Sequence, residues 1–291
     1  MVRIVQHKEI NKKKWDHCLQ NSRQERVYAY YDFLTQNVGN RWFGLVFGDY
    51  DAIMPITFKR KYGFLIYITQ PNFCQQLGVF SKVEFDQDLF QSFMKMLGKK
   101  LIFKTHYFFN ASNTPFLKKH KKRPNFILNL HQTYQNIYDS YKDDLKRNLK
   151  KAEKNQLIWE ENISVEACTN MYIKAHGRHY TNLDYAFFNR IKKNTQIKMH
   201  QIGVKKENEL LATALILQDN GRLYYLLGAP SVKGKKMGAL PFLIDRLIKK
   251  FSKNKIFLDF EGSQIPSVAN FYQKFGTQTE YFIEYQTRIF L

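Results

Sequence analysis

The chain has 291 residues, of which 44% are hydrophobic and 16% aromatic, and 46 Lys and Arg residues against 25 Asp and Glu give a net charge of +21. This length suits about two domains of roughly 100 to 200 residues each, and the apolar content excludes a chain that is disordered throughout. The charge favours polyanionic partners such as RNA, nucleotide phosphates or an anionic membrane face, although a composition rich in Lys, Asn and Ile also arises from an AT-rich genome.

The first 130 residues are predicted to form an α/β domain. Short apolar segments separated by polar or glycine-bearing breaks read as strands, at 42–50, 52–63 and 64–71. Helical patterns flank them around 14–19 and 90–103. A basic stretch, FLKKHKKRP at 116–124, reads as a solvated connection into a further strand.

The second domain is predicted to cover residues 131–291. Its pattern runs from an amphipathic helix at 138–156 through two helical stretches to a strand, a hairpin, a helix, a strand, a helix and a closing strand. The hairpin turns at Asn220-Gly221, a pair that readily supplies the positive φ angles of a tight turn. Leucine and isoleucine at spacings of three and four in GALPFLIDRLIKKF indicate a core-facing helix.

The three cysteines, Cys18, Cys74 and Cys168, are too widely spaced for a disulfide framework or a zinc knuckle, which fits a reducing compartment. No signal peptide is recognisable, and no apolar run approaches the roughly 18 residues needed to cross a bilayer. His176 and His179 stand three apart in HGRHY without matching carboxylates or cysteines, so no metal site is predicted. We expect a soluble, cytoplasmic protein.

Motifs in the second domain resemble those of the GNAT acyltransferases. Ala269, Tyr272 and Gly276 follow the late A-x-x-x-Y-x-x-x-G-F motif with altered spacing. Three segments between 138 and 276 resemble the FemABX-type branch and its BioF2-like relatives, namely SYKDDLKRNLKKAEKNQL, GALPFLIDRLIKKF, and FLDFEGS with FYQKFG. The resemblance implies an α/β (α+β) fold of two GNAT-like domains, each with a mixed, mostly antiparallel sheet flanked by helices.

The same resemblance implies transfer of an acyl or aminoacyl group to an amine. The donor would be acyl-CoA or aminoacyl-tRNA, acting as a co-substrate rather than a tightly bound cofactor, so tRNA is an expected partner. The acceptor would be a small molecule or a peptide, with cell-wall precursors among the candidates. Attack by a neutral amine requires donors for the oxyanion, a route for the amine proton and an acid for the leaving group. The resemblance puts the oxyanion donor in the backbone of 223–229.

Catalytic residues are predicted around the strand KIFLDF and the following helix. Tyr272 matches the leaving-group acid of the superfamily, but its spacing between Phe271 and Phe275 also suits core packing. Asp259 and Glu261 stand two apart, so on a strand they would share a face and could accept the amine proton. They could equally be an ordinary polar strand end or a helix cap.

Two further groups of residues are predicted to bind ligands. Lys233, Gly234, Gly238 and Ala239 stand where the R/Q-x-x-G-x-G/A loop of GNAT enzymes binds coenzyme A, although Lys236 replaces the first glycine. Arg147 and Lys151, one helical turn apart, match a basic helix that would meet substrate phosphates, or form a solvated helix face. The alternative function is a catalytically inactive GNAT-like module that binds RNA or another polyanion. The sequence leaves the oligomeric state open.

Overall fold

A computed structural model describes residues 1–63, 65–98, 102–177, 185–193 and 197–288. The chain divides into two compact units, one of Met1–Pro124 with Glu280–Leu291 and one of Asn125–Thr279. The predicted division into domains of residues 1–130 and 131–291 stays a prediction. The structure adds that most of the closing strand belongs with the first unit.

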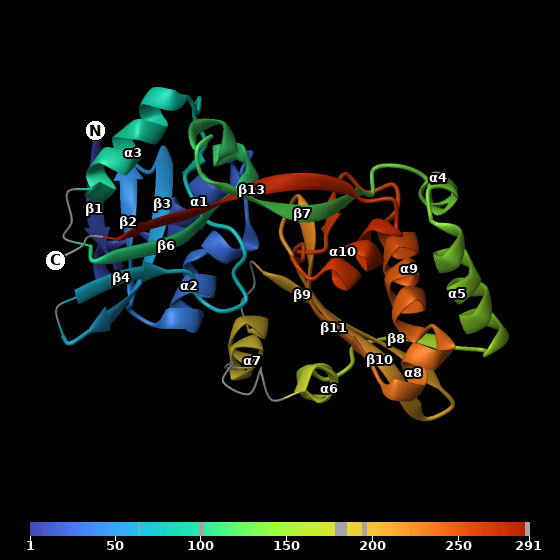
Figure 1. The fold of residues 1–291 in the computed structure, drawn as a ribbon. Helices are drawn as coiled ribbons and strands as arrows, with labels where there is room; N and C mark the ends of the chain where they lie inside the picture. The colour runs from blue at the N-terminus through green and yellow to red at the C-terminus, as the bar shows by residue number, and fades with distance from the viewer. Residues whose placement is uncertain (64, 99–101, 178–184, 194–196, 289–291) are drawn as a thin grey trace. The chain divides into compact units, whose positions relative to one another are not determined.

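The first unit is a sheet with helices packed against it (Figure 1). Its elements are β1 (Val2–Gln6), α1 (Lys12–Gln20), α2 (Tyr31–Val38), β2 (Trp42–Phe47), β3 (Ala52–Lys61), β4 (Leu65–Thr69), β5 (Phe80–Ser81), α3 (Gln87–Gly98), β6 (Lys104–Phe109), the start of β7 (Lys121–Asn129) and most of β13 (Gln278–Arg288). The strand order is β1-β2-β3-β4-β6-β13, with β5 on β3. Only β4 and β6 pair in parallel among the described pairs of this unit.

Two expectations for the first unit change. The basic stretch at 116–124 is not simply a connection, because Lys121 begins β7. The closing strand, predicted in the second half, pairs antiparallel with β6, with Ile283 opposite Phe109. That partner lies about 170 residues earlier in the chain, so no local sequence pattern could indicate it. Residues 99–101 and 289–291 of the predicted elements lie outside the described ranges.

The second unit is also a sheet with helices packed against it. Its elements are the end of β7, α4 (Tyr134–Asp139), α5 (Asp143–Lys154), β8 (Ile158–Glu161), α6 (Val165–His176), α7 (Ala186–Lys192), β9 (Lys198–Lys206), β10 (Glu209–Gln218), β11 (Arg222–Pro230), α8 (Val232–Met237), α9 (Ala239–Phe251), β12 (Phe257–Asp259) and α10 (Pro266–Gln273). The strand order is β7-β12-β11-β10-β9-β8, in which β11 and β12 pair in parallel and the other described pairs are antiparallel. This confirms the predicted α/β fold class, with a mixed and mostly antiparallel sheet.

Helices cover both faces of the second sheet (Figure 1). Ala212 and Ala214 of β10 belong to the buried core that also contains α9, whereas the Thr213 side chain between them faces Cys168 of α6, whose thiol donates to the Ala214 carbonyl at 3.7 Å. Because successive strand residues point to opposite faces, α9 covers one face and α6 the other. Tyr225 of β11 and the partly buried Tyr272 of α10 lie in the core on the α9 face.

Local chemistry differs from expectation at the hairpin and in the basic helix. Neither Asn220 nor Gly221 has a positive φ angle. Instead, the Asp219 carboxylate accepts hydrogen bonds from the backbone N–H groups of Gly221 (3.0 Å) and Arg222 (2.8 Å), which close the turn. The helix predicted at 138–156 is two helices, α4 and α5.

None of the described helices has both the length and the apolar content that crossing a membrane requires.

Candidate active site

The parallel pairing of β11 with β12 ends well before β11 does. Arg222, Leu223 and Tyr224 face Phe257, Leu258 and Asp259, and there β12 stops, while β11 continues to Pro230. After Asp259 the backbone turns, with positive φ angles at Glu261 (58°) and Gly262 (59°). Within the described ranges, β12 therefore offers no partner to the edge of β11 beyond Tyr224. A backbone edge left open in this way can bind a ligand through its N–H and C=O groups.

A β-bulge lies on this open edge. Tyr225 faces Ile216 of β10 and Leu227 faces Leu215, so Leu226 is the extra residue between two paired positions. A bulge bends its strand and redirects backbone groups, and bulges are frequent next to active sites. The bulge lies within the region of 223–229 in which the oxyanion donor is predicted, and that role stays a prediction.

The Tyr225 side chain folds back over the bulge. It is 5% exposed, and its hydroxyl oxygen is buried without a hydrogen-bond partner in the described chain. Burial raises the pKa of the Tyr225 hydroxyl well above its usual value, with smaller contributions from Tyr272 and Tyr172. A buried, unpaired hydroxyl costs free energy, so its presence beside an open edge suggests a position where a ligand or water completes the hydrogen bonds.

Tyr272 and Glu261 come together next to this edge. The Tyr272 ring packs on Phe260 at 4.8 Å between ring centroids and approaches Tyr225 edge-on at 6.2 Å. Loss of water around the carboxyl group raises the pKa of Glu261 well above its usual value. Burial and, to a lesser extent, the negative charge of Glu261 raise the pKa of Tyr272, so its hydroxyl keeps its proton.

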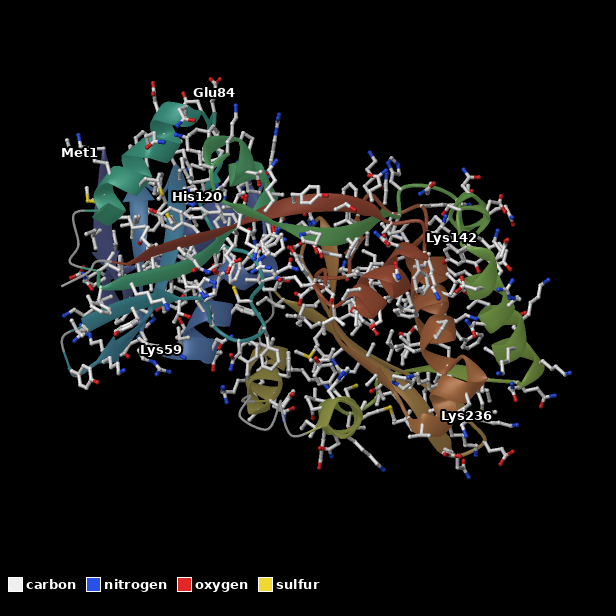
Figure 2. All side chains as sticks on the ribbon, in the orientation of Figure 1. Met1, Lys59, Glu84, His120, Lys142 and Lys236 are labelled. Atoms are coloured by element: carbon white, nitrogen blue, oxygen red, sulfur yellow. The ribbon has the colours of Figure 1, made fainter. Side chains whose placement is uncertain are left out.

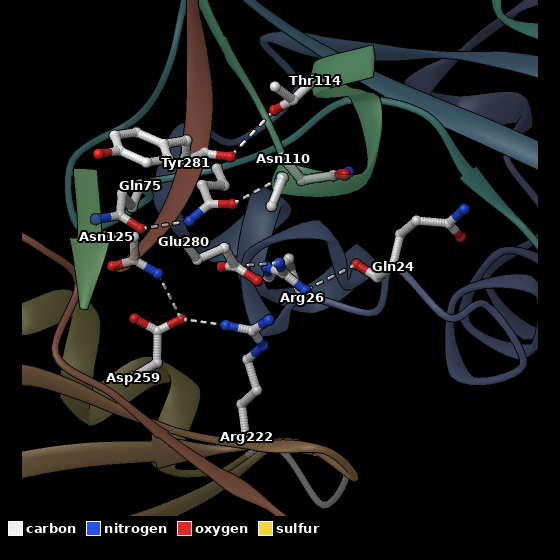
Figure 3. Close-up of polar contacts among 12 residues, drawn as sticks. Gln24, Arg26, Gln75, Asn110, Thr114, Asn125, Arg222, Asp259, Glu280 and Tyr281 are labelled. Carbon is white, nitrogen blue, oxygen red and sulfur yellow. Dashed lines mark hydrogen bonds and ion pairs between the residues drawn. The ribbon is translucent and has the colours of Figure 1, made fainter. Parts of the chain in front are cut away.

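Asp259 takes a different place from Glu261. Its side chain is 1% exposed, and one carboxylate oxygen accepts from Arg222 Nη1 at 2.7 Å and from Asn125 Nδ2 at 3.1 Å (Figure 3). The other oxygen accepts from the backbone N–H of Glu261 at 2.8 Å. Asp259 alternates with Phe260, which packs on Tyr272, so its side chain points to the opposite face of the sheet.

The argument that Asp259 and Glu261 share a face is therefore wrong. Pairing with β7 continues to Phe260, whose N–H donates to the Phe126 carbonyl, but Glu261 has a left-handed backbone conformation, so the i, i+2 rule does not reach from Asp259 to Glu261. The structure brings Tyr272 and Glu261 together, whereas Asp259 forms an ion pair with Arg222 on the opposite face of the sheet.

The predicted coenzyme A loop has most of its groups engaged within the protein. It forms α8, where the Gly234 N–H donates to Ser231 Oγ at 3.0 Å and the Gly238 N–H donates to carbonyls of α8 itself. A Cβ on Gly234 would lie 2.0 Å from the Leu211 carbonyl oxygen, so this glycine permits close packing on β10. Lys233 forms an exposed ion pair with Glu209, and Ala239 is buried at the start of α9. Coenzyme A binding at these residues stays a prediction.

Arg147 and Lys151 lie on the exposed side of α5, whose Leu145, Leu149 and Ala152 are buried. This helix packs on α9 and α8. Their predicted role in phosphate binding stays a prediction. Among the described residues, no three His, Cys, Asp or Glu side chains are grouped to hold a metal ion, and His179 lies outside those ranges.

Sequence reasoning did not select Tyr225. Tyr225 follows an apolar strand pattern and reads as core, and only the bulge reveals its position. His176 was considered only for metal binding, and its ring packs on Tyr172 of the same helix at 4.4 Å between ring centroids.

No protein-family model and no curated protein matches the chain. Solved structures match over nearly its full length. FemX is 12% identical with a TM-score of 0.68 and 96% of each chain covered, and a conserved protein of unknown function from Bacteroides thetaiotaomicron is 8% identical with a TM-score of 0.60, over 99% of this chain and 100% of that one. A tandem GNAT protein from the clavulanic acid biosynthesis pathway is 6% identical with a TM-score of 0.54 and 98% of each chain covered. The chain therefore has a FemX-like fold of two GNAT-like units, as predicted.

Proposed function

We propose that the protein is an N-acyltransferase of the GNAT type, which passes an acyl or aminoacyl group from an activated ester or thioester to an amine. The observation that carries this proposal is the open edge of β11, where pairing with β12 ends at Tyr224 opposite Asp259 and the bulge at Leu226 follows. The likeness in fold to FemX and to a tandem GNAT protein supports the same class of reaction.

In the proposed reaction the amine nitrogen attacks the donor carbonyl carbon. A carbon–nitrogen bond forms, the carbon–oxygen or carbon–sulfur bond of the donor breaks, the amine loses a proton, and the leaving alcohol or thiol gains one. Backbone N–H groups at the Leu226 bulge would stabilise the oxyanion, because preorganised donors in a dry site act strongly on developing charge. No covalent enzyme intermediate is needed.

Tyr272 would protonate the leaving group. Its hydroxyl stays protonated because burial raises its pKa, and it lies beside Glu261, whose pKa burial also raises. A protonated Glu261 can then return a proton to Tyr272 after each turnover. Asp259 would position this pair, since it holds the backbone N–H of Glu261 while Arg222 neutralises its charge.

The donor is proposed to be an aminoacyl-tRNA in preference to acyl-CoA. The N–H groups of Gly234 and Gly238, which would cradle a pyrophosphate in the usual loop, already donate inside the protein. A ligand that binds only the folded state raises the melting temperature. Alanyl-tRNA should therefore raise it more than acetyl-CoA does, and the reverse order would overturn the choice of donor.

A transfer assay tests the reaction itself. Product formation is measured with alanyl-tRNA and with acetyl-CoA as donors and with glycinamide or hydroxylamine as acceptor. Tyr272→Phe should lower kcat by about 10²-fold, the usual size of an acid–base contribution, without lowering the melting temperature. Tyr62→Phe removes a phenol that is 73% exposed and serves as the matched control. A fully active Tyr272→Phe variant would remove Tyr272 from the mechanism.

The acceptor is proposed to be a phosphorylated amine, such as a cell-wall precursor, with Arg147 and Lys151 contacting its phosphates. A guanidinium binds phosphate in a bidentate way, and both side chains are exposed on α5. Arg147→Ala should weaken binding of such an acceptor. Arg23→Ala, which removes an equally charged exposed side chain from the first unit, should not.

A cavity in the first unit favours polyanion binding as a second candidate function. The cavity has a volume of about 350 Å³, and its lining includes Lys59, Arg60, Lys61, Lys104 and His106. Within the described chain these Lys and Arg side chains form no ion pair with a carboxylate, and Figure 2 shows Lys59 extending outward from the ribbon. Uncompensated cations from neighbouring strands attract phosphate groups.

Binding of a labelled RNA oligonucleotide over a salt series tests this second function. Affinity should fall steeply with salt, and Lys59→Gln with Lys104→Gln should reduce the slope. The pair Lys142→Gln with Lys236→Gln changes the net charge equally at exposed positions in the second unit. Equal losses in both pairs would show that overall charge, and not the cavity, binds RNA.

A further inference from the structure

The cationic cavity of the first unit lies on a row of paired residues that crosses three strands. Lys59 of β3 is directly opposite Tyr67 of β4, and Tyr67 is paired in turn with Lys104 of β6. Paired residues of neighbouring strands point to the same face of a sheet, so the tyrosine lies between the two lysines. Because neighbouring strands are about 4.8 Å apart, the backbones that carry the two lysines are roughly 10 Å apart.

A second row, next to the first on the same face, brings a histidine beside the tyrosine. Thr69 of β4 is paired with His106 of β6, and both lie two residues further along their strands than Tyr67 and Lys104. All four residues line the cavity, which has a volume of about 350 Å³. The His106 side chain is 40% exposed, and Tyr67 is partly exposed. Two aromatic rings therefore lie on one face, on neighbouring strands.

Helices cover only part of this face. α2 lies over β2 there, because the Trp42 indole N–H donates to Thr35 Oγ1 at 3.3 Å. Trp42 is paired with Thr57 of β3, which is 1% exposed. Lys59, two residues further along β3 on the same face, is exposed. The cavity therefore begins beyond the part of the face that α2 covers, and a ligand can reach the two rings from solvent.

Contacts within the first unit hold both rings in place. His106 Nε2 is hydrogen-bonded to Glu284 Oε1 at 2.9 Å, and Glu284, which is 7% exposed, accepts from Arg123 Nε at 2.6 Å. The Tyr67 ring packs on Phe103 at 5.2 Å between ring centroids. A ring that is already fixed loses little conformational freedom when a ligand stacks on it, which favours binding.

We propose that this face binds a single-stranded polynucleotide, whose bases stack on Tyr67 and His106 and whose phosphates contact Lys59 and Lys104. The inference rests on the polyanion binding proposed for the cavity and names its ligand. Exposed aromatic rings bordered by cations bind single strands without sequence preference, because every base has a flat face that can stack. A duplex offers phosphates but keeps its bases stacked inside the helix, so it lacks half of these contacts.

Fluorescence anisotropy with labelled probes tests the inference. The probes are a short single-stranded RNA, the same sequence as a duplex, and an abasic strand of equal length and charge. The single strand should bind more tightly than the other two. Tyr67→Leu should weaken its binding by about 10-fold, which is typical for the loss of one stacked base, and should leave the abasic strand unaffected. Tyr67→Phe keeps the ring and should bind the single strand like the wild type.

A salt series separates stacking from charge. Tyr67→Leu should lower the affinity for the single strand at every salt concentration without changing the slope of log K against log salt. Lys59→Gln, which removes one phosphate contact, should make that slope shallower by about 1. Tyr281→Leu is the matched control, because Tyr281 is 50% exposed in the same unit. It lies three residues from Glu284 on β13 and so on the opposite face of the sheet.

The outcomes separate stacking from polyanion binding. Equal binding of all probes, with Tyr67→Leu like the wild type, would overturn the stacking and leave the polyanion binding intact. No binding of any probe would contradict both. Free AMP should compete only at far higher concentration than the strand, and competition at similar concentrations would replace the strand by a mononucleotide. His106→Gln, whose amide can still donate to Glu284, removes the second ring and repeats the test if Tyr67→Leu lowers the melting temperature.

Discussion

The Tyr225 hydroxyl occupies the space that a side chain on Gly228 would need. A Cβ built on Gly228 would lie 1.6 Å from the hydroxyl oxygen and 2.1 Å from the adjacent ring carbon. The bulge at Leu226 makes this contact possible, because it brings Gly228 next to the side chain of Tyr225. The buried position of the Tyr225 hydroxyl therefore depends on the absence of a side chain at Gly228.

Gly228→Ala should destabilise the protein and lower acyl transfer together. The added methyl group cannot be accommodated unless the buried Tyr225 ring moves, and overpacking of this kind costs about 1–3 kcal/mol. Urea unfolding measures the stability, and the alanyl-tRNA assay measures the transfer. Gly221→Ala, in the turn of the same hairpin, is the control because its Cβ would meet nothing within 4 Å. Equal stability of the two variants would show that Tyr225 has room to move.

The sequence predicts those parts of the fold whose burial repeats along one element. The helix at 239–251 is an example, since Leu243, Ile244, Leu247 and Ile248 are fully buried at the predicted spacings of three and four. This periodicity is a property of the helix's own sequence, so it can be recognised without knowing what the helix packs against.

The site depends on features that have no local signature. The left-handed conformation of Glu261 ends strand alternation, and its side chain gives no indication of this. The contact of Tyr225 with Gly228 requires a bulge whose register is set by pairing with β10. Tyr272 could be predicted only from its resemblance to a motif, and whether it is catalytic stays a prediction.

Asp259→Asn should destabilise the second unit strongly. The carboxylate is 1% exposed and pairs with Arg222, whose side chain is only 12% exposed, so the substitution removes the negative charge that Asp259 supplies to a largely buried guanidinium. Breaking one partner of a buried pair costs about 3–5 kcal/mol. Denaturant unfolding followed by tryptophan fluorescence gives the change in the free energy of unfolding.

Asp49→Asn is the matched control for this prediction. Asp49 pairs with Lys14, but the two side chains are 71% and 48% exposed, so water screens their attraction. This variant should unfold like the wild type. A loss at Asp259 no larger than that at Asp49 would mean that Arg222 finds another partner or reaches solvent.

Glu261→Gln should stabilise the protein at pH 8 and leave its stability unchanged near pH 4. Burial raises the pKa of Glu261 above its unfolded value of 4.5, so the folded state binds the proton more tightly than the unfolded state. The resulting stability is fully present below about pH 4.5 and is lost as the pH rises through the raised pKa, because the partly buried carboxylate then becomes charged. Glutamine has no such titration, so the difference in unfolding free energy between variant and wild type should grow with pH over this window.

Glu84→Gln, at an exposed position, removes a carboxylate without that burial and should show a much smaller pH-dependent difference. A Glu261→Gln variant whose stability tracks the wild type from pH 4 to 9 would show that Glu261 is ionised and solvated, and the proton return to Tyr272 would have to be abandoned.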